Sequence, residues 1–216
     1  MSCKRLRYCR SEILGHRAEI DLRLLGIDEA GRGALIGPLV IGLVEISSPL
    51  RSAVRDSKEL SRQQRENLFQ EIVDQADLVD HIKIEPWEID RENINRLEYR
   101  KIQEWLQDRG EYDGIYIDAF MDPLSLKKLG KYVIADYKAD SKYPIVSAAS
   151  IVAKVYRDRY IDELHARYGD FGSGYPSDSR TIEFLKDPQN FRDLERYIRK
   201  KWSTYRTLKN NKLNNF

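Results

Sequence analysis

Apolar residues along this chain recur with two periods, which predict strands interleaved with helices. Short runs rich in Val, Ile and Leu, bounded by glycine, proline or polar residues, are typical of strands. The expected strands are 24–28, 38–46, 81–86, 114–118 and 132–135. Longer segments with helical spacing predict helices at 61–76, 92–108, 123–129 and 146–168, followed by two shorter helical segments up to about Trp202. This alternation indicates an α/β fold whose sheet need not be wholly parallel.

The helix expected after Leu60 has the clearest start signal in the chain. Ser61 and Gln64 have the spacing of a capping box, in which each side chain bonds the backbone of the other residue. The apolar residues that follow are expected to form its buried face: Leu68, Phe69, Ile72, Val73 and Ala76.

The chain shows no internal repeat and no linker-like stretch, so 1–216 is expected as one domain. Residues 1–20 form a basic extension, which could contact a nucleic-acid backbone or be a passive tail. The catalytic unit is expected over 21–202, and 203–216 as a polar tail that frays at its end.

Composition limits the classes of protein that fit. The charged fraction is 33% and the hydrophobic fraction 41%, as in a globular protein with an ionised surface. The net charge of +2 means that affinity for nucleic acid would need a local basic patch. Cys3 and Cys9 have no metal-finger spacing, which argues against a disulfide scaffold and favours a reducing, cytoplasmic location. No run is long and apolar enough for a membrane span or a secretory signal.

The most informative stretch is Gly26-Ile27-Asp28-Glu29-Ala30-Gly31-Arg32-Gly33, at the end of an expected buried strand. Two adjacent carboxylates there are costly without a counter-charge. The glycine–arginine–glycine that follows offers backbone N–H groups and a guanidinium fork, both suited to a phosphate. The stretch therefore suggests chemistry on a phosphodiester, and the alternative is a solvated turn that the glycines merely bend.

Two further acids occupy similar places. Asp118 ends the expected strand 114–118, and Asp140 precedes the long helix 146–168. If strands 24–28 and 114–118 are neighbours, their terminal acids meet at one sheet edge, where α/β proteins tend to place ligands. Clustered carboxylates suit Mg²⁺ or Mn²⁺, and two such ions can activate a water at a phosphate. Because the chain has 35 acidic residues, any single acid is more often a surface residue.

Several blocks, in order from about Leu24 to Trp202, resemble ribonuclease HII. The blocks are 26–33, 56–58, 117–119, 138–140 and 148–158, and the segments 172–178 and 180–181 resemble the archaeal branch. The resemblance implies a ribonuclease H-like mixed central sheet flanked by helices, with a C-terminal helical extension. It implies hydrolysis of the RNA strand of RNA–DNA hybrids and incision 5′ to ribonucleotides embedded in duplex DNA, leaving 3′-hydroxyl and 5′-phosphate ends. A monomer is expected.

The resemblance also implies site residues. Asp28, Glu29, Asp118 and Asp140 fall on the family's four metal-binding carboxylates, which hold two ions of Mg²⁺ or Mn²⁺ so that metal-activated water attacks. The substrate-binding positions are Gly31, Arg32, Gly33, Lys58, Lys154 and Tyr175.

Their implied roles differ. The glycine–arginine–glycine loop would read the 2′-hydroxyl and its phosphate through main-chain groups. Tyr175 would pack on the sugar after the ribonucleotide, although an ordinary loop aromatic is the alternative in a chain with 13 tyrosines. Three basic residues would lie near the substrate backbone: Lys58, Lys154 and Arg157. The alternative for Arg157 is a solvated position on the helix surface. Asp158 is expected to form a simple ion pair with a neighbour.

Departures from the family pattern are few. Ala34 stands where many relatives have proline, which should loosen the loop slightly. Asn210, Leu213 and Phe216 have the spacing of a peptide that binds a sliding clamp, but the usual glutamine and second aromatic are missing, so a frayed tail is the alternative.

Two rival functions follow from the same residues. Ribonuclease HIII shares the catalytic core, but the roughly 23 residues before the first expected strand are too few for its added domain. A nucleic-acid-binding protein that does not cleave would have no use for a full set of repelling carboxylates. His16, His81 and His165 show no spacing for paired acid–base catalysis, and surface or packing roles are expected for them.

Overall fold

The computed structural model describes residues 22–50 and 60–213, and the side chains of 211–213 are not described. Its strands form one sheet in the order β3-β2-β1-β4-β5. Their bounds are β1 Leu24–Ala30, β2 Leu39–Ile46, β3 Leu78–Ile84, β4 Gly114–Asp118 and β5 Val133–Asp136. Strand β2 is antiparallel to both β1 and β3, whereas β1, β4 and β5 are parallel. The mixed sheet expected from the sequence is confirmed.

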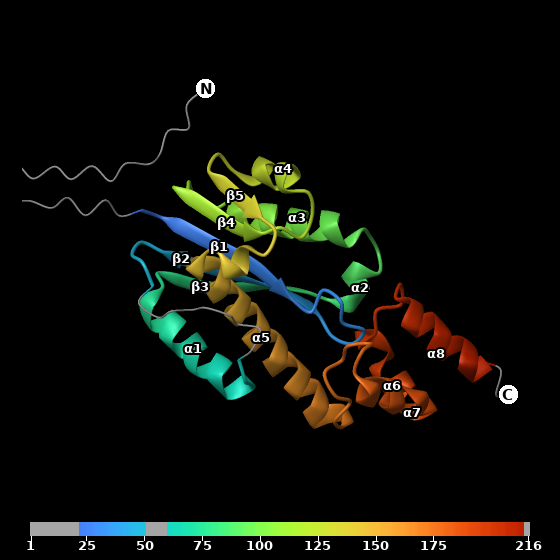
Figure 1. The fold of residues 1–216 in the computed structure, drawn as a ribbon. Coiled ribbons are helices and arrows are strands. Elements are labelled where there is room, and N and C mark those ends of the chain that lie inside the picture. Colours follow the sequence, from blue (N-terminus) through green and yellow to red (C-terminus); the bar gives the residue numbers. More distant parts are fainter. Residues whose placement is uncertain (1–21, 51–59, 214–216) are drawn as a thin grey trace, which may run out of the picture.

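Helices cover both faces of the sheet (Figure 1). The bounds are α1 Arg62–Gln75, α2 Pro86–Ile89, α3 Ile94–Leu106, α4 Pro123–Leu126, α5 Pro144–Tyr168, α6 Ser179–Lys186, α7 Pro188–Leu194 and α8 Ser203–Leu213. Three short 3₁₀ turns are η1 Lys127–Leu129, η2 Ala139–Ser141 and η3 Glu195–Tyr197. Helices α3 and α4 lie on one face and α1 and α5 on the other, while α6, α7 and α8 group beyond the end of β1. None of the helices in the described ranges is both long and apolar enough to cross a bilayer.

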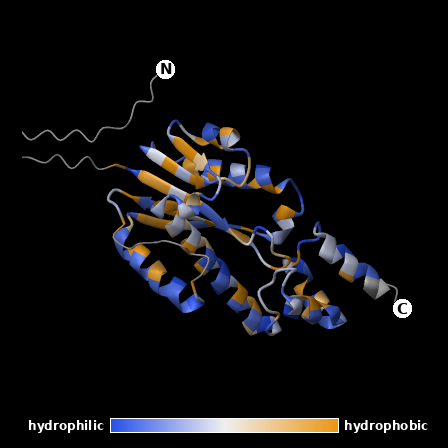
Figure 2. Ribbon diagram, in the orientation of Figure 1, coloured by the Kyte–Doolittle hydropathy of each residue, from blue (hydrophilic) through white to orange (hydrophobic). Residues whose placement is uncertain are grey.

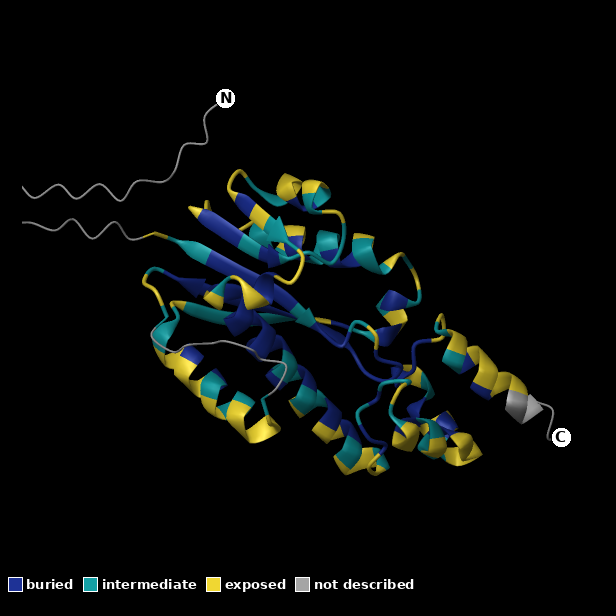
Figure 3. Cartoon of the chain, in the orientation of Figure 1, coloured by how far each residue is buried: buried dark blue, intermediate teal, exposed yellow. Residues whose placement is uncertain are grey.

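Two apolar cores flank the sheet, and a third lies in the C-terminal helices. Leu25 and Ile27 of β1 pack toward α3, whereas Val44 of β2 packs with α1 and the first half of α5. Figure 2 shows the apolar strands between helices with hydrophilic outer faces. Figure 3 shows the first half of α5 as buried as the strands beside it, because it lies between the sheet and α1.

Helix α5 rests with its backbone directly on β1 and β2. A Cβ atom added to Gly26 would lie 2.3 Å from the carbonyl oxygen of Ile145, and one on Gly42 would lie 2.2 Å from that of Ala149. Any side chain at either position would push the helix off the sheet. The two glycines therefore set how close α5 comes to the end of β1.

Helix α1 begins as expected, with both bonds of the Ser61–Gln64 capping box present. Its buried face is narrower than predicted, because Phe69 and Ile72 are buried whereas Val73 is 40% exposed. The third strand begins at Leu78, earlier than the predicted start at 81, because antiparallel pairing with β2 extends to Glu45.

The C-terminal segment differs most from the prediction. Residues 203–216 were expected as a tail, but Ser203–Leu213 form helix α8. Tyr205 and Leu208 are buried in the third core, where the ring of Tyr205 stacks on that of Phe191 at a centroid distance of 5.5 Å. These two side chains, one turn apart, anchor α8 on that core.

The contact of α5 with the sheet predicts the effect of one small substitution. Gly42→Ala should lower the free energy of unfolding by about 3 kcal/mol, the upper end of the usual overpacking range, because backbone atoms of α5 must move. Gly130→Ala is the matched control, since among the described residues its Cβ would meet only the side chains of Ile115 and Val133, at 3.3 and 3.5 Å. Chemical denaturation of both variants checks this, and equal stabilities would contradict it.

Candidate active site

The predicted carboxylates begin at the end of β1. In the parallel pairing of β1 with β4, Ile27 lies opposite Ile117, so the next residues, Asp28 and Asp118, continue the same register. The two strands are therefore neighbours, which was the condition for their terminal acids to reach the same sheet edge.

Asp28 is a buried carboxylate with few compensating partners. It is 5% exposed, and its Oδ1 accepts a hydrogen bond of 2.7 Å from the backbone N–H of Glu29. Burial raises the pKa of Asp28 well above its usual value, and the charges of Glu29 and Asp118 raise it further. A hydrogen bond from Ser150 of α5 opposes this shift.

Glu29 is partly buried and shares this electrostatic environment. Burial and the charge of Glu98 raise the pKa of Glu29 to about 8, against the opposing effect of Arg32, and Asp118 adds to the increase. Asp118 thus lies close enough to raise the pKa of both Asp28 and Glu29, and Glu29 lies close enough to raise that of Asp28.

Asp140 is tied to the same edge through its neighbour. The N–H of Ala139 donates to Oδ1 of Asp118 at 2.8 Å, which joins the turn η2 to the end of β4. Lys138, just before this turn, has a left-handed backbone with φ of 57°. Asp140 is 8% exposed, and its Oδ1 accepts from the N–H of Ser141 at 3.0 Å. The structure therefore places the segment of the fourth predicted acid beside the third.

The donor chemistry of these acids fits a hard divalent cation. All four side chains offer only carboxylate oxygens. Burial, followed by the charges of neighbouring carboxylates, raises the pKa values of Asp28 and Glu29, and a cation would offset both effects. Within the described ranges, no three His, Cys, Asp or Glu side chains are already gathered around one metal position. The assignment of all four as metal ligands stays a prediction.

The loop after β1 carries Gly31, Arg32 and Gly33, and the Arg32 side chain is already engaged. Its guanidinium pairs with Glu98 and donates to Asn95, both on α3. The side chain therefore anchors the loop, in place of the phosphate contact that its guanidinium suggested. Gly33 is exposed, and a Cβ added there would have the ring of Tyr175 as its nearest neighbour, at 3.9 Å.

Because Ala34 replaces a proline, the loop was expected to be slightly loose, but the structure shows that it is held. The N–H of Ala34 donates to the carbonyl of Gly31 at 3.2 Å, a bond that proline cannot make. Its side chain is completely buried. This hydrogen bond closes the turn that begins at Gly31, whose φ of 84° suits glycine.

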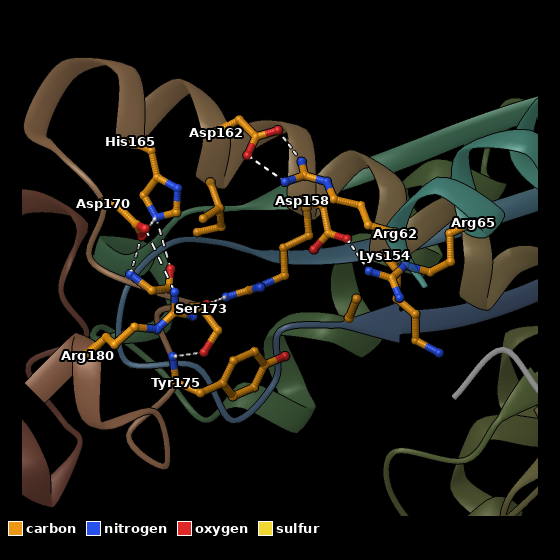
Figure 4. Close-up of a pocket in the computed structure, with 14 residues that line it drawn as sticks. Arg62, Arg65, Lys154, Asp158, Asp162, His165, Asp170, Ser173, Tyr175 and Arg180 are labelled. Atoms are coloured by element: carbon orange, nitrogen blue, oxygen red, sulfur yellow. Dashed lines mark hydrogen bonds and ion pairs between the residues drawn. The ribbon is translucent and has the colours of Figure 1, made fainter. Parts of the chain in front are cut away.

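A cavity of about 500 Å³ adjoins the end of β1. Figure 4 shows it between α5, the start of α1 and the loop that carries Tyr175. Its cationic lining residues are Arg62, Arg65, Lys154, Arg157 and Arg180, against three aspartates. Lys154 and Tyr175, both predicted to contact substrate, therefore line one basic cavity.

Arg157 is neither a solvated surface residue nor a free phosphate ligand. It is 5% exposed, donates to the carbonyl of Ser173 at 3.2 Å, and lies 4.7 Å from the ring centroid of Tyr175. Asp158 forms the simple ion pair that was offered as its alternative, with Arg65 at 2.7 Å. Arg157 thus holds the Tyr175 loop through one hydrogen bond and one contact with the aromatic ring.

Sequence reasoning missed Glu98, Ser150 and Arg199. Glu98 could have been noticed, because a carboxylate next to Leu97 and four residues before Ile102 lies on the apolar face of its helix. Arg199 is completely buried, but no local pattern marks it.

The remaining predicted residues have simpler outcomes. Lys58 lies outside the described residues, as does His16. His81 stacks on Tyr156 and His165 packs edge-on against Phe171, so both have the packing role that was one of the two expected alternatives.

Comparison with known proteins agrees with this geometry. The profile of the family described as Ribonuclease HII matches residues 25–205. A protein named Ribonuclease HII from Pyrococcus horikoshii is 46% identical over 204 residues, covering 87% of this chain and 93% of its own length. One of the same name from Thermoplasma volcanium is 45% identical over 198 residues, covering 85% and 92%.

Solved structures show the same relationship. The crystal structure of the ribonuclease H2 from Pyrococcus horikoshii OT3 has a TM-score of 0.78 and 42% identity, covering 88% of this chain and 98% of its own. The PCNA:RNase HII complex from Archaeoglobus fulgidus has a TM-score of 0.76 and 38% identity, covering 84% and 96%. Bst-RNase HIII in complex with Mn²⁺, at 18% identity and a TM-score of 0.73, shares the fold and covers 87% of this chain and 69% of its own. With a ribonuclease H-like sheet and this match over nearly its whole described length, the chain belongs to the Ribonuclease HII family, whose members are endoribonucleases of RNA–DNA hybrids.

Proposed function

We propose that this enzyme cleaves the RNA strand of hybrids and also incises duplex DNA 5′ to a single embedded ribonucleotide, leaving 3′-hydroxyl and 5′-phosphate ends. One observation carries the proposal: the carboxylates at the end of β1 are followed directly by Ala30, which lines the basic cavity. A nucleic-acid backbone bound in that cavity would pass the carboxylate edge.

The carboxylate edge is the proposed site of hydrolysis. Asp28, Glu29, Asp118 and Asp140 would hold two ions of Mg²⁺ or Mn²⁺, which when bound supply an activated water and offset charge on the scissile phosphate. Ser150 holds Asp28 by a hydrogen bond, and the N–H of Ala139 holds Asp118. These contacts orient the two acids before any substrate binds. The Mn²⁺ complex of Bst-RNase HIII, which has the same fold, is consistent with this choice of cations.

The exposed backbone at Gly33 is the proposed reader of the ribose. Because Gly33 has no side chain and faces Tyr175, a sugar can approach the main chain and the aromatic ring together. The 2′-hydroxyl is the group that distinguishes a ribonucleotide within DNA. Arg157, over the ring of Tyr175, would keep that ring in place.

The cations of the cavity are the proposed contacts to the substrate backbone. Arg62 pairs with Asp162 and Arg65 with Asp158, so these two charges are partly neutralised. Lys154 lines the cavity one turn of α5 after Ser150 and is proposed to contact a phosphate. Lys58, which lies outside the described residues, is proposed from the sequence to contact the substrate backbone as well.

We also propose that the C-terminal tail binds a sliding clamp. The Archaeoglobus fulgidus relative was solved as a complex with PCNA. Here Asn210 lies in α8, Leu213 ends that helix, and Phe216 lies outside the described residues. From the sequence, we also propose that the enzyme is monomeric and cytoplasmic.

Cleavage of a defined duplex tests the proposed function. Wild-type protein with Mg²⁺ or Mn²⁺ should cut a DNA duplex with one ribonucleotide on its 5′ side, and gel mapping of the product ends checks this. Asp118→Asn keeps an acceptor for the N–H of Ala139 but removes the charge, so turnover should fall about 100-fold or more while the fold is retained. An intact duplex under varied metal and pH would favour the rival that binds without cleaving.

Tyr175 provides a test of substrate preference. Tyr175→Ala should reduce cleavage at a single ribonucleotide about 10-fold more than cleavage of long hybrids, on the scale of one aromatic stacking contact. Tyr175→Phe is the matched control, because it keeps the ring beneath Arg157. The kcat/KM values on both substrates decide the point, and equal losses for the alanine variant would reject the sugar-packing role.

The raised pKa of Glu29 predicts a pH-dependent stability without metal. Its pKa is about 8 in the fold against an ordinary 4.5, so its stabilising effect is complete below pH 4.5 and is lost as the pH rises through 8. The Tm of metal-free protein should therefore fall by about 2–4 °C for each kcal/mol lost. Mn²⁺ should raise the Tm more at pH 8 than at pH 5.5, because protons compete for the same oxygens.

Glu29→Gln is the control for that measurement, because its amide does not titrate. Calorimetry at several pH values should give a flatter profile for this variant than for the wild type. Identical pH profiles would show that Glu29 is not the group responsible.

A further inference from the structure

The loop between β1 and β2 is held from outside by C-terminal segments. The N–H groups of Leu35 and Ile36 both donate to the carbonyl of Gly174, at 2.8 and 2.9 Å. The N–H of Gly37 donates to the carbonyl of Tyr197 at 2.9 Å, and Ile36 forms an antiparallel bridge with Ile198. The conformation of residues 31–37 therefore depends on chain that lies more than 130 positions later.

Arg199 makes the most extensive of these contacts. Its side chain is completely buried. Its Nη2 donates to the carbonyl of Gly31 at 2.7 Å, its Nη1 to that of Arg32 at 2.8 Å, and its Nε and Nη2 to that of Gly37 at 3.2 and 3.1 Å. One planar guanidinium thus joins both ends of the loop.

A buried guanidinium of this kind is costly unless it is well bonded. Within the described residues, Arg199 has no carboxylate at ion-pair distance, and burial together with nearby Arg157 lowers its pKa to about 9. Three loop carbonyls take the place of a counter-ion, through bonds that are strengthened by the charge. Arg199 and this loop conformation are therefore mutually dependent.

The bonded carbonyls determine where the adjoining N–H groups point. A trans peptide is planar, so its C=O and N–H point in opposite directions. Arg199 draws the carbonyls of Gly31 and Arg32 inward, which turns the N–H groups of Arg32 and Gly33 outward on the other side. Within residues 22–50 and 60–213, neither of these N–H groups donates to a protein acceptor.

We propose that Arg199 is a positioning residue that orients two peptide groups of the loop, so that the N–H groups of Arg32 and Gly33 face the ribonucleotide. This role rests on the proposed function, and it explains why the loop has the conformation that the function needs. It makes the C-terminal helical extension a part of substrate recognition, because the residue that orients the reading loop comes from it.

Binding measurements separate this role from a general stabilising one. All measurements use protein that carries Asp118→Asn, so that the substrate is not cleaved. Into this protein, Arg199→Met and Arg199→Lys are introduced separately. The affinity for a DNA duplex with one ribonucleotide is divided by that for the same duplex in all-DNA form. Arg199→Met should lower this ratio about 10-fold, the scale of two hydrogen bonds. Arg199→Lys should recover only part, because an ammonium lacks the planar fork.

Amide hydrogen exchange gives a second readout that does not need substrate. Arg199→Met should speed exchange at residues 31–37, while β1 and β2 stay protected. Arg192→Met is the matched control, because Arg192 is exposed on α7 and, among the described residues, its side chain bonds only Gln189. This control should keep both the wild-type affinity ratio and the wild-type exchange.

The possible outcomes distinguish a failure of the positioning role from a failure of the proposed function. Wild-type protein that cleaves neither substrate would contradict the proposed function. If the wild type cleaves, equal losses of affinity for both duplexes in Arg199→Met would overturn the positioning role. Wild-type exchange at residues 31–37 in that variant would overturn it as well.

Discussion

The direct contact between the backbone of α5 and the sheet is the constraint on which the rest of the structure depends. Gly26 and Gly42 leave no side chain between the helix and strands β1 and β2, so α5 lies as close as backbone atoms permit. That distance lets Ser150 bond Asp28, and it places Arg157 against the loop after β1. A wider spacing would separate the carboxylate edge from the basic cavity and leave two unconnected surfaces.

Buried charges of opposite sign lie near each other in this site, and each is costly to bury. Burial and the charges of neighbouring carboxylates raise the pKa values of Asp28 and Glu29, and the hydrogen bond of Ser150 and the charge of Arg32 offset only part of this rise. The buried guanidinium of Arg199 is offset, by loop carbonyls. The first arrangement leaves buried carboxylates that resist ionisation, and the second holds the backbone of the adjacent loop.

The C-terminal helices act on the site without lining the carboxylate edge. Their apolar core includes Leu35 and Ile36 of the loop after β1, so loop and helices bury the same surface. Helix α8 completes that core with Tyr205 and Leu208. The active-site loop therefore takes its shape from residues at the other end of the chain, and Glu98 of α3 adds a third support through Arg32.

Local patterns were enough to predict the strands, the long helices and the place of Asp28 and Asp118 at strand ends, because apolar periodicity and strand-end position are local properties. Strand β4 has the predicted bounds, and the capping box of α1 is present. Only the tertiary structure decided that Arg32 bonds α3, that Arg157 is buried, that residues from Ser203 form a helix, and that Arg199 holds the loop. Each of these depends on partners tens to more than a hundred positions away, or on burial that packing creates, and no local pattern records such contacts.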